Sequence, residues 1–159
     1  MLQDICCEAL AYKKKEDVIF KNLTRIHYTI FEGGAQDIEP VASAVEKLIL
    51  ALDIINDIQD NDNEDAPWSK IESSQSLNVA LWFLTASMQE ILKTGFSNTG
   101  IALSCLYGNL NASIEGQYLD LHNCYNTEEE YLEICNKKSG SLVAMSCLVG
   151  TALATSECK

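Results

Sequence analysis

LDIINDIQD, residues 52–60, combines an apolar helical pattern with four oxygen-bearing side chains. Each residue of an α-helix advances by about 100°, so Asn56, Asp57 and Asp60 fall at roughly −60°, +40° and −20° relative to Asp53. The four side chains therefore share one side of the helix, where carboxylates repel one another unless a cation lies among them. Oxygen ligands one turn apart suit Mg²⁺, which takes one or two carboxylates and fills its octahedron with water and phosphate oxygens.

This segment alone is consistent with two interpretations. It can be a Mg²⁺-binding face, or it can be an acidic helical face that is only solvated. A calcium-binding EF-hand loop over residues 60–71 is excluded. Its sixth position is Asp65 where the loop needs glycine, and its twelfth is Ile71 where the loop needs glutamate.

Composition favours one compact domain spanning residues 1–159, since 47% of the residues are hydrophobic and 21% charged. The formal net charge of −12 disfavours nucleic acid and anionic membrane surfaces as partners. Seven cysteines, an odd number without a CxxC pair, indicate reduced thiols and a cytoplasmic protein. No membrane span is expected, because the longest nearly uncharged stretch, residues 139–156, falls short of the roughly 20 apolar residues required.

Helix is predicted nearly throughout, because apolar residues recur with a period near 3.6 and the chain has only two prolines. The short connections predict that successive helices pack antiparallel in an all-α bundle. The expected helices cover residues 2–14, 16–32, 39–61, 74–93, 97–123, 127–137 and 139–156.

Further polar residues follow the acidic segment. Gln117 and Asp120, three residues apart, share a helical face, and Gly116 allows that face to approach another element closely. Lys138 and Ser139 are expected near the start of an apolar helix, where an ammonium and a hydroxyl can bind an anion. Each pattern alone is more often a surface pair or a solvated group.

The order of these motifs resembles the trans-prenyl diphosphate synthase family of the polyprenyl synthetase superfamily. Asn56-Asp57-Ile58-Gln59-Asp60 stands where that family has its first Asp-Asp-x-x-Asp motif. The resemblance runs from residue 42 to residue 152. The chain is most similar to ComQ-type isoprenyl transferases, which prenylate a tryptophan of a quorum-sensing pheromone precursor; the Asn-Asp and Pro67-Trp68 that follow the motif point to this branch.

The resemblance implies a helical bundle of the isoprenoid synthase type and a reaction that begins by ionising an allylic prenyl diphosphate with Mg²⁺. The roles it implies can be carried over to individual positions. Asp57 and Asp60 would ligate Mg²⁺ beside Asn56, a neutral replacement for an aspartate; Lys138 would contact the diphosphate; Ser139 takes a position often held by threonine; and Gln117 and Asp120 would line the cavity. The isoprenoid tail would lie along Val45, Ile49 and Leu52, although ordinary core is the commoner role of such apolar positions.

The chain lacks two groups of lysine and arginine residues that are typical of the family. The Gly-Gly-Lys-Arg-x-Arg-Pro motif that grips isopentenyl diphosphate has only a degenerate counterpart in residues 21–25, and the arginine pair after the first aspartate motif is replaced by an acidic loop. A peptide acceptor carries no diphosphate and does not need these cations. The departure therefore favours protein prenylation over chain elongation.

The family's second aspartate-rich motif would lie beyond Lys159, so the resemblance implies the N-terminal portion of the fold, truncated at its C-terminal side. The leading expectation is a Mg²⁺-dependent prenyltransferase that modifies a pheromone tryptophan. Alternatives are a noncatalytic helical relative that acts by protein association, a short-chain prenyl diphosphate synthase, and an enzyme of terpene cyclase type. A cavity wall left exposed would be covered by formation of a homodimer.

Overall fold

The computed structural model describes residues 1–15, 17–122 and 125–157, and all regular structure within these ranges is helical. The all-α prediction is therefore confirmed for this part of the chain. The elements in chain order are α1 (Leu2–Lys13), α2 (Ile19–Ile30), α3 (Glu39–Asp60), the 3₁₀-helix η1 (Pro67–Lys70), α4 (Ser73–Lys93), α5 (Thr99–Leu121), α6 (Glu128–Cys135), the π-helix η2 (Asn136–Gly140) and α7 (Ser141–Thr155).

The helix ends follow from local residue chemistry. Helix α3 stops where Asn61 adopts a left-handed conformation with φ 55°, which asparagine tolerates better than most residues. Helix α6 begins after Thr127, whose side chain accepts a hydrogen bond from the Glu130 backbone nitrogen, as expected of an N-cap. The predicted helix start at residue 16 and helix end at residue 123 lie outside the described residues.

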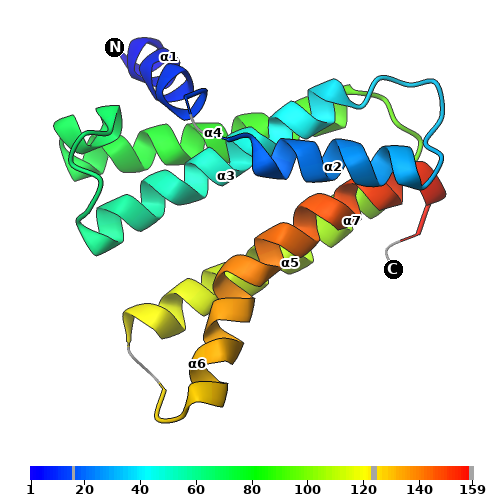
Figure 1. The fold of residues 1–159 in the computed structure, drawn as a ribbon. Coiled ribbons are helices and arrows are strands. Elements are labelled where there is room, and N and C mark those ends of the chain that lie inside the picture. The colour runs from blue at the N-terminus through cyan, green and yellow to red at the C-terminus, as the bar shows by residue number, and fades with distance from the viewer. Residues whose placement is uncertain (16, 123–124, 158–159) are drawn as a thin grey trace.

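Two helical pairs form the body of the molecule (Figure 1). Helix α3 packs antiparallel to α4, helix α5 packs against α7, and α2 packs against both α7 and α3. Helix α3 contributes to two hydrophobic clusters, one shared with α2, α4, α5 and α7 and the other with α1, η1 and α4. The acidic segment thus belongs to the helix on which the two clusters meet.

Antiparallel packing of successive helices was a correct prediction for α3 and α4 but a wrong one for α4 and α5. These two scarcely touch, because α5 leaves the turn at Gly95 and packs on α7 instead. The left-handed φ of 71° at Gly95 supports this change of direction. A cavity lies between α3 and α5, and the residues of these two helices that line it come from the C-terminal half of each.

The predicted helix break at Lys138 is also wrong. Residues 128–155 form one continuous helix, and η2 is a widened π turn within it (Figure 1). Lys138 and Ser139 therefore do not stand at a free helix N-terminus, so the backbone of a helix end does not contribute to anion binding there. The backbone nitrogens of this turn are instead engaged within the helix.

None of the helices in the described ranges combines the length and the apolarity that crossing a bilayer requires. The expectation of reduced thiols holds for Cys6, Cys7, Cys135 and Cys147 but fails for Cys105, which is disulfide-bonded. Both Cys6 and Cys7 belong to α1, where Cys7 is exposed and Cys6 is buried.

Replacement of Gly108 by alanine is expected to raise the free energy of unfolding by about 0.5–1 kcal/mol, the helix-propensity difference between the two residues. Gly108 lies in the middle of α5, is exposed, and has open space where a Cβ would be added. Urea denaturation followed by circular dichroism measures the change. An unchanged or lower midpoint would contradict the open environment of this glycine.

Candidate functional site

A cavity of about 270 Å³, here called the α3–α5 cavity, opens between α3, α4, α5 and η2. One part of its lining is polar and consists of Asn56, Gln59, Ser113, Gln117 and Lys138. The remainder is formed mainly by apolar side chains, namely Leu52, Ile55, Leu84, Leu110, Ile114, Tyr118 and Leu121. The cavity therefore offers both hydrogen-bonding groups and a surface for a hydrocarbon chain.

Leu52 lines the cavity as expected, whereas Ile49 and Val45 do not. Both are almost completely buried in the core cluster between α2, α3, α5 and α7. Of the three residues expected along an isoprenoid tail, only Leu52 is placed to contact one.

Gln117 connects α5 to the acidic helix. Its Nε2 donates a hydrogen bond of 3.0 Å to Oε1 of Gln59 on α3. The residue is only 7% exposed, and its buried Oε1 accepts no hydrogen bond from any described residue. Buried polar atoms are rarely left unsatisfied, so this oxygen is a ready acceptor for a ligand that enters the cavity. Sequence reasoning missed Gln59, although it lies three residues from Asn56 and hence on nearly the same helical face.

Gly116 brings η2 against α5. A Cβ at this position would collide with the backbone nitrogen of Lys138 and lie 2.7 Å from the carbonyl carbon of Lys137. Ser113, one turn earlier, donates a 2.7 Å hydrogen bond to the backbone oxygen of Lys138. The close approach predicted for Gly116 is therefore confirmed, and the element that approaches is the π turn.

Lys138 faces the cavity with its ammonium fixed by Asp120. The Nζ–Oδ2 distance is 2.6 Å, and the two side chains are 26% and 33% exposed. Asp120 does not line the cavity, but it orients the Lys138 ammonium, which does. Ser139 is exposed and does not line the cavity, because the π turn directs it elsewhere.

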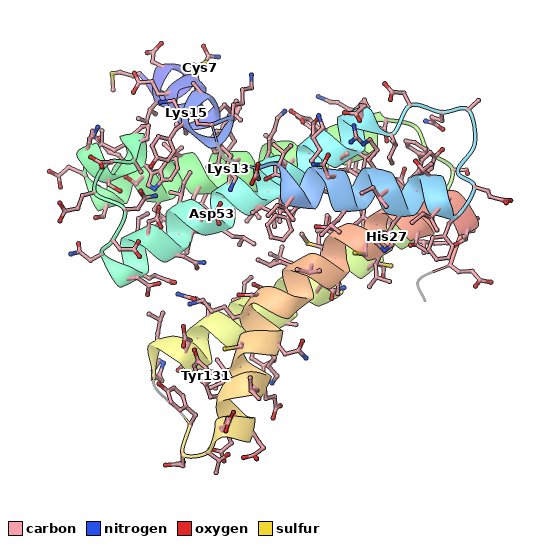
Figure 2. All side chains as sticks on the ribbon, viewed as in Figure 1. Cys7, Lys13, Lys15, His27, Asp53 and Tyr131 are labelled. Carbon is pink, nitrogen blue, oxygen red and sulfur yellow. The ribbon has the colours of Figure 1, made fainter. Side chains whose placement is uncertain are left out.

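The acidic residues of α3 do not act as one cluster. Asn56 faces the α3–α5 cavity, while Asp53 forms a 2.8 Å ion pair with Lys13 of α1 (Figure 2). Asp60 is exposed in the last turn and makes no hydrogen bond or ion pair with a described residue. Helical-wheel angles placed these side chains on one side of α3, but they contact different parts of the structure.

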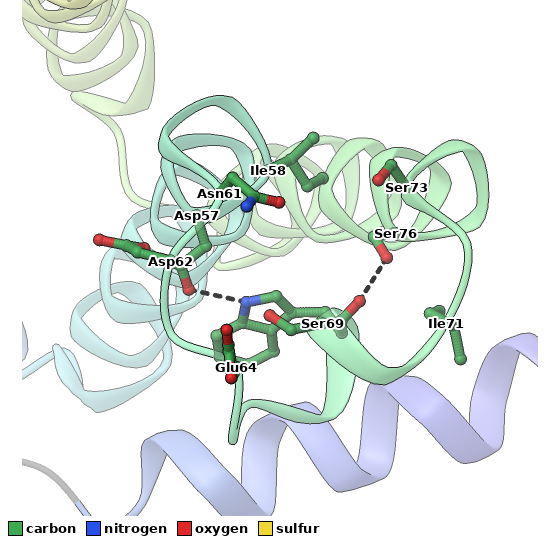
Figure 3. Close-up of a pocket in the computed structure, with 10 residues that line it drawn as sticks. Asp57, Ile58, Asn61, Asp62, Glu64, Ser69, Ile71, Ser73 and Ser76 are labelled. Atoms are coloured by element: carbon green, nitrogen blue, oxygen red, sulfur yellow. Dashed lines mark hydrogen bonds between the residues drawn. The ribbon is translucent and has the colours of Figure 1, made fainter.

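Asp57 lies in a separate hollow of about 340 Å³ beside η1 (Figure 3). Its Oδ2 accepts hydrogen bonds of 2.8 Å from both Nε1 of Trp68 and Nδ2 of Asn63. Burial raises the pKa of the Asp57 carboxyl, nearby Asp62 adds to that rise, and the two hydrogen bonds oppose it. The structure thus brings Asn56, Gln117 and Lys138 together at one cavity and holds Asp57 outside it.

The residues near the cavity suit a metal that arrives with a substrate better than one held by the protein alone. Within the described ranges, no three His, Cys, Asp or Glu residues are grouped so that they could hold a metal ion. Asn56 and Asp60 lie one turn apart on α3 and provide an amide oxygen and a carboxylate, neither of which has a hydrogen-bond or ion-pair partner among the described residues. Mg²⁺ commonly binds through one or two carboxylates, with waters and phosphate oxygens completing its coordination, so this donor set fits Mg²⁺.

The cations of the degenerate segment 21–25 are occupied elsewhere. Lys21 Nζ lies 2.8 Å from Oε2 of Glu39, and Arg25 Nη1 lies 3.5 Å from Oε1 of the same residue. The hydrogen bond from Lys21, together with its positive charge, lowers the pKa of Glu39. Neither cation lines the α3–α5 cavity.

Comparison with known proteins agrees with this architecture. The polyprenyl synthetase family model matches residues 18–159, so the chain belongs to the polyprenyl synthetase family. It is 39% identical over 146 residues to the tryptophan prenyltransferase ComQ of Bacillus subtilis subsp. natto strain BEST195, and 36% identical over 144 residues to ComQ of Bacillus subtilis strain 168. These matches cover 91% and 90% of the chain but 46% and 48% of the relatives, so the chain spans about half their length.

A solved structure shares the fold. The polyprenyl synthetase from Streptomyces coelicolor A3(2) superposes with a TM-score of 0.75 at 23% sequence identity. The match covers 85% of this chain and 42% of that one. The helical arrangement expected from the family resemblance is therefore confirmed.

Proposed function

We propose that this chain binds an allylic prenyl diphosphate together with Mg²⁺ and takes part in prenylating a tryptophan of a pheromone precursor peptide. The observation that carries the proposal is the two-part lining of the α3–α5 cavity. Asn56, Gln117 and Lys138 form its polar region, and leucine and isoleucine side chains form the rest. A prenyl diphosphate has the same division between a charged head and a hydrocarbon tail. Membership of the polyprenyl synthetase family and the similarity to ComQ support the assignment.

The proposed roles combine the cavity lining with the positions that the family resemblance assigns. Lys138, oriented by Asp120, contacts the diphosphate. The role of Ser139 rests on the family resemblance alone, because its hydroxyl does not line the cavity. Asp57 and Asp60 ligate Mg²⁺ beside the neutral Asn56. Bound Mg²⁺ supplies the positive charge that stabilises diphosphate as a leaving group.

The occupied cations of α2 support an uncharged acceptor. Because Lys21 and Arg25 are paired with Glu39, this segment has little free positive charge for a second diphosphate. An indole ring is uncharged, so its binding does not require a free cation from the protein. Gln117 Oε1, which lacks a partner among the described residues, can accept the indole N–H.

Calorimetric titration with farnesyl diphosphate, with and without Mg²⁺, tests the proposal. We expect binding that depends on Mg²⁺ and binding of a tryptophan-containing precursor peptide that strengthens once the diphosphate is bound. Isopentenyl diphosphate should not replace the peptide. Absence of Mg²⁺-dependent heat would favour the noncatalytic, association-based alternative, and binding of isopentenyl diphosphate as the second ligand would favour chain elongation.

A further inference from the structure

Trp68 is the buried centre of the connection between α3 and α4. The residue is 3% exposed and lies in η1, and its indole nitrogen donates to Asp57 at 2.8 Å. At its other end, the backbone oxygen of Trp68 accepts a 2.5 Å hydrogen bond from Ser76 Oγ on α4 (Figure 3). The indole N–H is therefore held at a fixed place relative to the acidic helix.

Helix α1 braces the same group. The ring of Tyr12 meets the Trp68 ring edge to face, with centroids 5.4 Å apart, and its hydroxyl donates to Oδ1 of Asn63 at 3.1 Å. Asn63 in turn donates to the Asp57 oxygen that the indole also contacts. Asn63 has a left-handed φ of 54°, so its backbone places the amide there at some conformational cost. Two donors thus converge on one carboxylate oxygen of Asp57, and Tyr12 of α1 contacts both of the residues that carry them.

This bracing turns Asp57 away from the site where it is proposed to act. Asp57 borders the hollow beside η1, while its neighbour Asn56 borders the α3–α5 cavity. Hydrogen bonds to a charged group are among the stronger ones in proteins, so moving the carboxylate toward the cavity requires breaking favourable contacts. Any ligand that recruits Asp57 must supply that free energy.

We propose that Trp68 is a positioning residue that holds the Asp57 carboxylate away from the α3–α5 cavity, so that Asp57 joins the metal and diphosphate only after its hydrogen bond to the indole breaks. This inference rests on the proposed function. In this view Trp68 sets the affinity for Mg²⁺ by holding Asp57, and Trp68 itself does not contact the substrate. In the absence of the indole N–H, Asp57 is released more easily.

The test compares wild type with Trp68→Phe, which keeps an aromatic ring but removes the N–H. Binding of an alkyl bisphosphonate is measured by calorimetry over a series of Mg²⁺ concentrations. We expect the half-saturating Mg²⁺ concentration to fall about tenfold in the variant, the lower end of what a hydrogen bond to a charged group contributes. A merely structural role of Trp68 predicts the opposite sign, because a loosened η1 would weaken binding.

Ser76→Ala is the matched control, since it removes the bond to the Trp68 backbone oxygen and leaves the indole–Asp57 bond in place. Its half-saturating concentration should stay within about twofold of wild type, because one neutral hydrogen bond distant from the carboxylate is lost. An unchanged or raised value in Trp68→Phe, or an equal fall in Ser76→Ala, overturns the inference. If Trp68→Phe does not fold, Asn63→Gly removes the second donor to Asp57, suits the left-handed backbone, and should lower the value in the same direction.

Fluorescence gives an independent readout. The chain has two tryptophans, so Trp82→Phe leaves Trp68 as the only tryptophan, and selective excitation of tryptophan then reports on it without emission from the tyrosines. Addition of Mg²⁺ and bisphosphonate should shift its emission as the indole loses its carboxylate partner, and an unaltered spectrum at saturating ligand counts against the inference. Mg²⁺-dependent binding without these effects removes the positioning role alone, whereas no such binding in wild type or Trp68→Phe removes the proposed function as well.

Discussion

Replacement of Asp60 by asparagine is expected to weaken Mg²⁺-dependent binding of farnesyl diphosphate by about a hundredfold, the upper range for altered metal sites. Asp60 is the carboxylate of the acidic motif that has no hydrogen bond or ion pair with a described residue. It lies one turn from Asn56, which faces the cavity, and Asn56 has no charge to compensate for its loss. Calorimetry at fixed Mg²⁺ concentration measures the change.

Asp65→Asn provides a control for the loss of one negative charge. Asp65 is exposed in the loop after α3 and borders neither the α3–α5 cavity nor the hollow beside η1. Its replacement should alter binding by less than about twofold, since salt screens exposed charges at a distance. Equal effects of the two substitutions would mean that the acidic region acts only through its overall charge, and Asp60 would then lose its assigned role.

Replacement of Gly116 by alanine should lower the free energy of unfolding by about 2–3 kcal/mol, the upper part of the range for overpacking in a closed site. The added methyl group would collide with the backbone of Lys138, and backbone cannot move aside as a flexible side chain can. Displacement of η2 would also shift the Lys138 ammonium, so diphosphate binding should weaken in the same variant. Urea denaturation and calorimetry measure the two effects.

Gly108→Ala is the matched control, because it makes the same chemical change in the same helix at an open position. The two variants should move stability in opposite directions. A Gly116→Ala protein as stable as wild type would show that α5 and η2 can separate without cost, which would contradict the tight contact seen between them.

The helices could be predicted from the sequence because their signals are local. Apolar periodicity and the helix start at Thr127 depend on residues within a few positions of each other. The prediction that Gly116 marks a close approach also succeeded, since only a missing side chain permits one. The π turn was missed because lysine, serine and glycine in sequence are typical of a helix start, and nothing local distinguishes a start from a widened turn.

The division of the acidic motif could not be predicted for a different reason. A helical wheel gives the direction of each Cα–Cβ bond but not the partner that each side chain finds. Asp53 is drawn to Lys13, which lies 40 residues earlier, and Asp57 to an indole 11 residues later. These partners are set by how α1 and η1 pack on α3, which is a property of the tertiary structure.

The π turn also separates two parts of one continuous helix that differ in how easily they unfold. Helix α6 has one buried residue, Ile134, whereas α7 buries eight against α2 and α5. Opening of α6 therefore exposes little apolar surface and can occur as a local fluctuation, while opening of α7 requires global unfolding. Lys138 lies in η2, between the weakly buried α6 and the well-buried α7. The backbone that carries its ammonium can therefore fluctuate on the α6 side and is held in place on the α7 side.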